Sequence, residues 1–303
     1  MPIDWCGVYA AATTEFHPDE RLDPAATKLH FERLIDDGIH GLVVMGTVGE
    51  GTSLDPDEKR EVLRLGIEAS RGRVPVVTGV AEYTTRAACR WAAEAERLGA
   101  DGLMVLPGMV YKPRSAENLA HFRAVARASG LPVMLYNNPV SYGVDLRPEQ
   151  IAELADEPTI RAVKESSDDP RRITDIANLV GDRYVLLCGV DDLVLESIVL
   201  GARGWVSGLV NAFPAENRLL WDLTLAGRFD EARAVYRWYT PLLHLDTRPT
   251  LVQCIKLAAA LTGLGGEAVR APRRPLDGAE REEVVALVRR AIRDRPPTRT
   301  GGA

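Results

Sequence analysis

The stretch DPDEKREVLRLGIEASRGRVPVVTGV, residues 55–80, contains one complete structural unit of the expected fold. Asp55 and Pro56 are typical of a helix N-cap followed by proline at the first helical position, and Gly72 is typical of a helix end. The apolar run 74–80 then indicates a short buried strand. The stretch therefore predicts an amphipathic helix that leads directly into a strand.

The same unit recurs along most of the chain. Candidate strands are Gly7–Thr13, Gly41–Gly46, Val74–Val80, Gly102–Leu106, Val133–Tyr136, Ile160–Lys164, Tyr184–Cys188 and Gly204–Ser207. From Gly41 onward the strands start 20 to 33 residues apart, which is typical of βα units with right-handed crossovers and parallel strands. Eight such strands favour a closed (β/α)8 TIM barrel over an open doubly wound sheet. The first βα turn also lacks the GxGxxG motif of a dinucleotide-binding fold.

The alternation stops after the eighth strand. Further helices are expected at Glu216–Ala226, Phe229–Leu243, Leu251–Leu261 and around Ala279–Arg293. The sequence therefore predicts a catalytic barrel over residues 1–228, a C-terminal helical extension over 229–296 and a disordered tail over 297–303.

Composition and charge disfavour several classes of partner and site. The 303 residues carry a net charge of −6 without a basic block, so nucleic acid is not an expected partner. No apolar run reaches the ~18 residues of a membrane span, and the N-terminus does not resemble a signal peptide. The four cysteines are far apart and form no CxxC or Cys/His cluster, which disfavours disulfides and zinc and favours a cytoplasmic location.

One lysine stands at a chemically suggestive place. Lys164, one of five lysines, ends an apolar strand in IRAVKESSDDP, residues 160–170. Because the C-terminal ends of barrel strands build the active site, and desolvation favours a neutral amine, Lys164 could attack a carbonyl and form a Schiff base. An ion pair with Glu165 or Asp168 is the structural alternative, and position alone leaves both open. Lys256 is a contrasting case, since its helical setting predicts a packed stem with the charge in water.

Other candidates lie at neighbouring strand ends. Tyr136 could relay protons to the Schiff-base carbon, although a rim aromatic is the ordinary interpretation. Thr47 could supply a hydroxyl to that relay, and the backbone N–H groups of Thr47, Val48 and Gly49 could hold a carboxylate. The GTVGE motif alone is no more than a turn.

Two acidic residues follow the seventh strand. Asp191 and Asp192 could bind substrate hydroxyls or an ammonium group, or they could cap the next helix. They would repel a phosphate there, which disfavours a phosphate-binding barrel isomerase.

Three motifs together resemble a known family. GTVGE, the tyrosine of YNNP and the lysine of VKESS occur in the order and approximate spacing of the dihydrodipicolinate synthase / N-acetylneuraminate lyase family, over about residues 7–276. The resemblance implies a barrel with a C-terminal helical extension, usually a homotetramer, that acts on a small pyruvate-like 2-oxo acid without metal or organic cofactor.

Residue roles follow from this resemblance. It implies that Lys164 forms the covalent imine, Tyr136 shuttles protons and Thr47 is the hydroxyl partner of Tyr136. It also implies that Gly189 and Val206 are wall positions near the Schiff base.

Departures from the family pattern bear on the substrate. Val48 stands where the synthases have a second threonine, so only its backbone N–H can hold the substrate carboxylate. Ser141 stands where they have an arginine that clamps the carboxylate of the aldehyde, a contact of ~1.5–3 kcal/mol. Tyr111 is a candidate for the tyrosine that a neighbouring subunit lends to the site. These departures disfavour 4-hydroxy-tetrahydrodipicolinate synthase activity.

The full motif set, with AEYTT, GVDD and LLHLDTRPTLVQCIK, most resembles the 1-pyrroline-4-hydroxy-2-carboxylate deaminases of hydroxyproline catabolism. For such a cyclic imino acid, Ser141, Asp191 or Glu82 could contact the hydroxyl and amine. A pyruvate-dependent aldolase or a sugar-acid dehydratase would share the imine, so the product would discriminate. A non-catalytic ligand-binding barrel is the alternative from another class, but it would need no lysine and tyrosine on adjacent strand ends.

Overall fold

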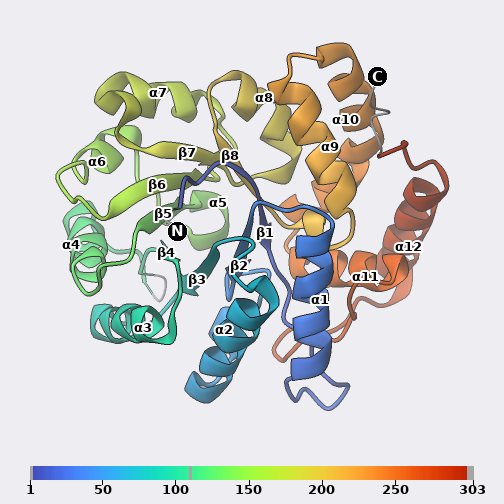
Figure 1. The fold of residues 1–303 in the computed structure, drawn as a ribbon, viewed down its shortest axis with the longest axis horizontal. Coiled ribbons are helices and arrows are strands. Elements are labelled where there is room, and N and C mark those ends of the chain that lie inside the picture. Colours follow the sequence, from blue (N-terminus) through green and yellow to red (C-terminus); the bar gives the residue numbers. More distant parts are fainter. Residues whose placement is uncertain (1–2, 109–110, 299–303) are drawn as a thin grey trace.

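A closed barrel of eight parallel strands organises the structure (Figure 1), a computed structural model that describes residues 3–108 and 111–298. The strands are hydrogen-bonded in sequence order. They are β1 (Gly7–Ala11), β2 (Gly41–Val44), β3 (Val76–Val80), β4 (Gly102–Val105), β5 (Val133–Asn137), β6 (Ile160–Glu165), β7 (Val185–Cys188) and β8 (Gly204–Ser207). This confirms the predicted (β/α)8 TIM barrel, and each strand starts within two residues of its expected position.

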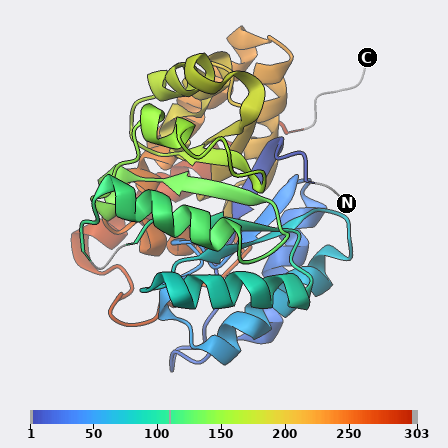
Figure 2. The same ribbon diagram turned by 90° about the vertical axis from the view of Figure 1, so that its left-hand side faces the viewer.

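Helices surround the barrel and connect its strands. They are α1 (Pro24–Asp36), α2 (Pro56–Ser70), α3 (Thr85–Leu98), α4 (Ser115–Ala126), α5 (Pro139–Tyr142), α6 (Pro148–Ala152), α7 (Arg171–Val180) and α8 (Val194–Val199). In α2 the expected start is explained by a capping box, in which the Glu58 side chain accepts from the Asp55 backbone N–H at 2.9 Å. Figure 2 shows α3 and α4 side by side on the outside of the barrel.

Strand register sets up the site. Tyr136 of β5 is the direct Cα partner of Lys164 of β6. Because side chains alternate along a strand and paired residues share a face, both side chains point to the same side of the sheet. The next pair, Asn137 and Glu165, faces the other way, and Asn137 Nδ2 donates to Glu165 Oε2 at 3.1 Å. The strand therefore separates Lys164 from its sequence-adjacent acid.

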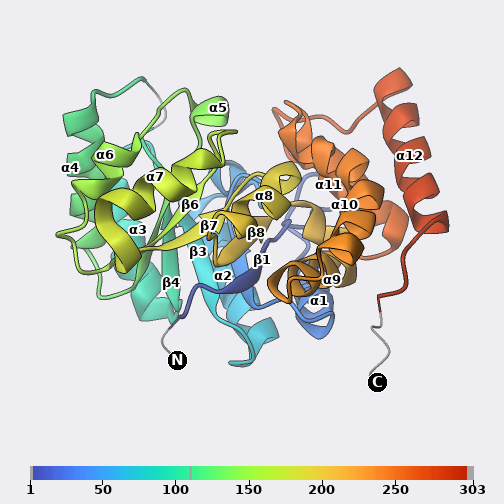
Figure 3. The same cartoon turned by 90° about the horizontal axis from the view of Figure 1, so that it is seen from above.

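The C-terminal helices gather on one side of the barrel (Figure 3). They are α9 (Pro214–Leu225), α10 (Phe229–Leu243), the short 3₁₀ helix η5 (His244–Thr247), α11 (Leu251–Thr262) and α12 (Gly278–Arg293). Residues 299–303 of the predicted tail lie outside the described residues. Over 3–108 and 111–298, no helix has the length and apolar character needed to cross a membrane.

A buried ion pair ties the extension to the loop after β2. Lys256 of α11 is 0% exposed, and its Nζ lies 2.7 Å from the Thr14 carbonyl oxygen and 3.1 Å from Glu50 Oε1. The prediction that its charge lies in water is therefore wrong, because Glu50 of GTVGE supplies a buried counter-charge. The same carboxylate accepts from the Arg270 backbone N–H at 3.0 Å. Glu50 thereby fixes the loop that carries Thr47.

Candidate active site

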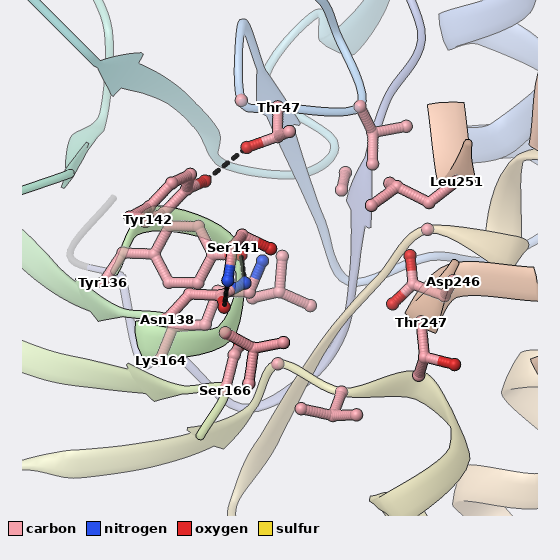
Figure 4. A pocket seen from close by; sticks show the side chains of 18 of the residues that line it. Thr47, Tyr136, Asn138, Ser141, Tyr142, Lys164, Ser166, Asp246, Thr247 and Leu251 are labelled. Carbon is pink, nitrogen blue, oxygen red and sulfur yellow. Dashed lines mark hydrogen bonds between the residues drawn. The ribbon is translucent and has the colours of Figure 1, made fainter. Parts of the chain in front are cut away.

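A cavity of about 410 Å³ opens at the C-terminal ends of the barrel strands (Figure 4). This is the end at which barrel enzymes carry their active sites. Its walls come from strand ends, from α5 and from the C-terminal extension. The lining residues are Ala11, Gly46, Thr47, Val48, Met104, Tyr136, Asn138, Val140, Ser141, Tyr142, Lys164, Ser166, Asp168, Gly189, Val190, Val206, Gly208, Asp246, Thr247, Arg248, Pro249 and Leu251.

Lys164 lies in this cavity with its amine near an aromatic ring. The side chain is 6% exposed, and Nζ lies 4.0 Å from the centroid of the Tyr136 ring. Within the described part of the chain, Lys164 forms no ion pair with Glu165 or Asp168. Gly189 makes room for it, because a Cβ there would lie 2.7 Å from Lys164 Cε. The structural alternative of a strand-end ion pair is thus absent.

The Tyr136 hydroxyl is oriented by its sequence neighbour. Asn138 Nδ2 donates to Tyr136 Oη at 3.0 Å. Asn138 Oδ1 accepts from the Ser141 backbone N–H at 2.9 Å and so caps α5. One amide therefore holds the start of α5 and the hydroxyl of Tyr136 together. The accepting role leaves the phenolic proton of Tyr136 free to be donated.

Tyr142 is the hydroxyl partner of Thr47. Their side chains are hydrogen-bonded, whereas the sequence predicted that Thr47 would pair with Tyr136. The rings of Tyr136 and Tyr142 pack edge to face, with centroids 5.7 Å apart. Burial, and next the nearby Tyr136 hydroxyl, raise the pKa of Tyr142 well above its usual value. Sequence reasoning missed Tyr142, although its position six residues after Tyr136, at the end of the short helix α5 that follows β5, offered a signal.

Asp191 does not line the cavity, contrary to its predicted contact with substrate. It begins the 3₁₀ helix η3 (Asp191–Leu193) and is 0% exposed. Its carboxylate accepts from Trp205 Nε1 at 2.8 Å, Ser207 Oγ at 3.1 Å, Gly208 N at 3.1 Å and Leu209 N at 2.8 Å. These four donors occupy its lone pairs, so Asp191 anchors the end of β8.

Two further predicted substrate contacts lie outside the cavity wall. Glu82 is paired with Lys59 of α2 at 2.5 Å and does not line the cavity. Gly49 also lies off the wall, and its carbonyl accepts from Thr14 Oγ1 at 2.8 Å. Tyr111 is exposed and is not among the lining residues. By contrast, Val48, Ser141, Gly189 and Val206 line the cavity as expected.

The structure adds polar groups that the sequence did not single out. Ser166 Oγ is buried beside Lys164 and has no hydrogen-bond partner among the described residues. Asp246, Thr247 and Arg248 reach the cavity from the C-terminal extension. Figure 4 shows Asp246 and Thr247 on the side that faces Tyr136 and Lys164. No cluster of three His, Cys, Asp or Glu side chains over 3–108 and 111–298 could hold a metal ion.

Comparisons with known proteins identify the relatives of this chain. Residues 4–291 match the Dihydrodipicolinate synthetase family. The chain is 34% identical over 292 residues to 4-hydroxy-tetrahydrodipicolinate synthase of Xanthomonas campestris, with 94% of each chain covered. It is 32% identical to the enzyme of the same name from Pelobacter propionicus, covering 93% of this chain and 97% of that one.

Solved structures of dihydrodipicolinate synthases have the same fold as this chain. A dihydrodipicolinate synthase from Bacillus anthracis superposes with a TM-score of 0.91 at 28% identity, covering 95% of this chain and 98% of the other. A chloride-inhibited synthase from Acinetobacter baumannii, complexed with pyruvate, gives a TM-score of 0.89 at 26% identity, with 95% and 99% covered. Since the sequence match spans nearly the whole chain and the folds superpose throughout, this chain belongs to the dihydrodipicolinate synthetase family of lyases.

Proposed function

We propose that this lyase uses Lys164 to form a Schiff base and deaminates 1-pyrroline-4-hydroxy-2-carboxylate to 2,5-dioxopentanoate and ammonia. Lys164 supports the imine because it is a buried amine on a cavity wall with no ion-pair partner among the described residues. The amine would act as the nucleophile and the resulting imine as an electron sink, so the proposed chemistry needs no cofactor.

The observation that carries the choice of substrate is Ser141 on the cavity wall. A synthase that condenses pyruvate with a carboxylated aldehyde needs a cation for the second carboxylate. At the position of the family's arginine this wall offers a short, exposed hydroxyl. The cyclic imine has a single carboxylate, next to the carbon that Lys164 would attack, and the rest of the molecule carries only a hydroxyl and a nitrogen.

The carboxylate would be held by the loop after β2. Thr47 and Val48 line the cavity, and no acceptor in the described part of the chain pairs with their backbone N–H groups. Two adjacent free N–H groups form a concavity suited to an anion. Ser166 Oγ, also without a partner there, is a further donor close to Lys164.

Ring opening would begin at C2 of the substrate. Attack by Lys164 on C2, with release of the C2–N bond, leaves a lysine imine at C2 and a free amine on C5. Tyr136 would give its phenolic proton to the departing ring nitrogen and then, as the phenolate, take a proton from C3 to give an enamine, since its ring packs against Nζ and its hydroxyl is fixed by Asn138. Thr47 and Tyr142 extend the chain of hydroxyls around this proton.

The enamine expels the C4 hydroxyl. Tautomerisation toward C5 gives a second imine, and hydrolysis at C5 and C2 releases ammonia and 2,5-dioxopentanoate. One water is lost at C4 and two are consumed in the hydrolyses, so the reaction consumes one water overall. A positioned acid–base group contributes typically ~10²–10⁴-fold to such proton transfers.

A second candidate is 4-hydroxy-tetrahydrodipicolinate synthase, the name that the relatives from Xanthomonas and Pelobacter carry. Arg248 lines the cavity and could meet a second carboxylate. Its guanidinium is, however, paired with Glu283 of α12 at 2.6 Å. A pyruvate-dependent aldolase or a sugar-acid dehydratase would use the same imine and would differ in product.

A product assay on the purified protein distinguishes these activities. We expect ammonia release from 1-pyrroline-4-hydroxy-2-carboxylate and little or no condensation of pyruvate with aspartate semialdehyde. Condensation at a rate comparable to the best reaction, or no ammonia, would refute the deaminase and favour the synthase or aldolase.

Substitution of Ser141 tests the substrate argument. Ser141→Arg places a fixed positive charge where the substrate amine would lie, and we expect deamination to fall by about tenfold or more through like-charge repulsion. Ser141→Gln adds bulk without charge and should cost less. Equal losses in steady-state ammonia release would show that size alone matters at this position.

We also propose that the protein works in the cytoplasm as a homotetramer. All four cysteines are free. Tyr111 is 62% exposed in the single chain and is available to a neighbouring subunit. Light scattering after size-exclusion chromatography gives the oligomeric state directly.

A further inference from the structure

The C-terminal extension places one acid in the cavity wall. Asp246 lies in η5, between α10 and α11, and its partly buried side chain lines the cavity. Figure 4 shows it across the cavity from Tyr136, on the same side as Thr247 and Leu251. Over residues 3–108 and 111–298, no lysine, arginine or histidine forms a salt bridge with it, whereas the neighbouring Asp192 is paired with His244 at 2.6 Å. Asp246 is therefore a cavity acid without a salt bridge to any described residue.

The barrel is shaped to accept this carboxyl group. Gly208 follows β8 and has φ −86 and ψ −45, which any residue could adopt. A Cβ at this position would nevertheless lie 2.6 Å from Asp246 Oδ1 and 2.7 Å from Ile255 Cδ1. A side chain at position 208 would therefore displace the Asp246 carboxyl group or the end of Ile255. Asp246 of the extension thus packs directly against the chain that follows β8 of the barrel.

The surroundings of Asp246 separate the protonation states of two acids. Asp191 of η3 accepts four hydrogen bonds from donors, which suit a carboxylate. Its charge and that of Asp192 face Asp246, as does Tyr239 of α10, while Lys164 is the facing cation. Burial and next the charge of Asp191 raise the pKa of Asp246 well above its usual value. Burial also raises the pKa of Asp191, to about 6, but its hydrogen-bond donors oppose that rise. At neutral pH the proton therefore resides on Asp246 while Asp191 keeps the charge, as in other sites where neighbouring carboxyl groups take different roles.

We propose that Asp246 is the general acid that protonates the departing hydroxyl, on the wall opposite the Lys164–Tyr136 pair. This inference rests on the proposed deaminase function and names the group for a step that Lys164 and Tyr136 leave uncatalysed. The enamine nitrogen lone pair forms the C2=N bond, the C2=C3 pair moves to C3–C4, and the C4–O bond breaks. The Asp246 proton passes to the leaving oxygen, so that water departs and a carboxylate remains. Solvent in the cavity then returns the proton to Asp246.

The position explains why an acid is needed beyond Tyr136. Tyr136 lies against Lys164 and so close to the imine carbon and C3. C4 and its oxygen lie further along the substrate, away from the strand ends that carry Lys164. The polar side chains that the C-terminal extension adds to the described cavity wall are Asp246, Thr247 and Arg248, and of these three Asp246 has the proton that is acidic enough to transfer.

Asp246→Asn tests the role, because asparagine keeps the shape and a hydrogen-bond donor but has no transferable proton. We expect ammonia release to fall by ~10²–10⁴-fold. Hydrogen exchange at the methyl group of pyruvate in D₂O, followed by NMR, should be unchanged, since it needs only the imine with Lys164 and C3 proton transfer, and pyruvate has no C4 hydroxyl to expel. Borohydride should trap an adduct on Lys164 that still contains the C4 hydroxyl, heavier by one water than a dehydrated adduct.

The pH profile gives a second readout. A raised pKa keeps Asp246 protonated and active at low and intermediate pH, and ammonia release by the wild type should fall as pH rises through it. That alkaline limb should be absent in Asp246→Asn. Asp192→Asn is the matched control, since it disturbs the same junction at the His244 pair without altering the cavity wall. It should retain ammonia release and its alkaline limb, with the limb moved to lower pH because one negative charge that faces Asp246 is lost.

Two outcomes overturn the inference. Ammonia release at the wild-type rate in Asp246→Asn would show that another group protonates the hydroxyl. A parallel loss of pyruvate exchange would show that Asp246 only maintains the structure of the site. Failure of the deaminase proposal has a different signature: the wild type itself would release no ammonia, while it still exchanges the pyruvate protons.

Discussion

Two lysines, Lys164 and Lys256, are almost equally buried but have opposite surroundings. They are 6% and 0% exposed, and both place Nζ over an aromatic ring, at 4.0 Å from the centroid of Tyr136 and 4.7 Å from that of Phe16. Lys256 also donates to the Thr14 carbonyl and to Glu50. Lys164 has no such pair within the described residues and faces a cavity.

This difference separates a structural lysine from a reactive one. An ammonium group removed from water costs several kcal/mol unless a counter-charge and hydrogen bonds compensate. Lys256 has both, and its contacts join α11 to the GTVGE loop. Lys164 lacks a fixed counter-charge and opens onto a space that fits a small molecule. Burial alone does not indicate whether a lysine is reactive. The presence or absence of a counter-charge and of hydrogen-bond partners does.

The largest effect is expected at Lys164. Lys164→Ala should lower turnover by ~10⁴-fold or more, the scale seen when a nucleophile is removed. Borohydride with pyruvate should label the wild type once, on Lys164, and leave the variant unlabelled by intact mass. An adduct mapped to Lys256, or no adduct in the wild type, would contradict the assignment of Lys164 as the reactive lysine.

Removal of the Tyr136 hydroxyl comes next. Tyr136→Phe should slow proton transfer by ~10²–10⁴-fold while imine trapping on Lys164 survives, because the ring that packs on Nζ is kept. Steady-state turnover and borohydride trapping on one preparation check this. Tyr142→Phe removes the hydroxyl bound to Thr47 and should cost less. Unchanged turnover in Tyr136→Phe would make Tyr136 a packing residue.

Substitution of Lys256 should lower the stability of the fold more than it lowers imine formation at Lys164. Lys256→Met leaves the buried Glu50 carboxylate without its lysine, and we expect a loss of about 3–5 kcal/mol in the free energy of unfolding. Chemical denaturation measures it, and pyruvate should still be trapped on Lys164 in the folded variant. In Lys256→Met the remaining cation at Glu50 is the more distant Arg273, with Nη1 3.7 Å from Oε2. The double variant Lys256→Met/Glu50→Gln removes the under-compensated carboxylate and should recover part of the loss. A stability equal to the wild type in Lys256→Met would show that the pair contributes nothing.

Much of the site could be predicted because it depends on local pattern. Asp55-Pro56 predicted the start of α2, and the apolar run before Lys164 predicted a strand whose end reaches the active-site rim. The sequence order of β5 and β6 then places the ends of these strands side by side, although the direct pairing of Tyr136 with Lys164 also needs a register shift between Val133 and Met134. These features depend on hydrophobic period and capping, which a single sequence carries.

The sequence by itself thus determined the barrel, its order of strands and the lysine at the end of β6. The tertiary structure decided the partners: it gave Lys256 to Glu50, 206 residues away, turned Asp191 and Glu82 from the cavity, and brought in Asp246 from the extension. The physical reason is that hydrophobic period reports which face of an element is buried. The partner that a buried polar group finds is set by packing between distant elements, and no local pattern records it.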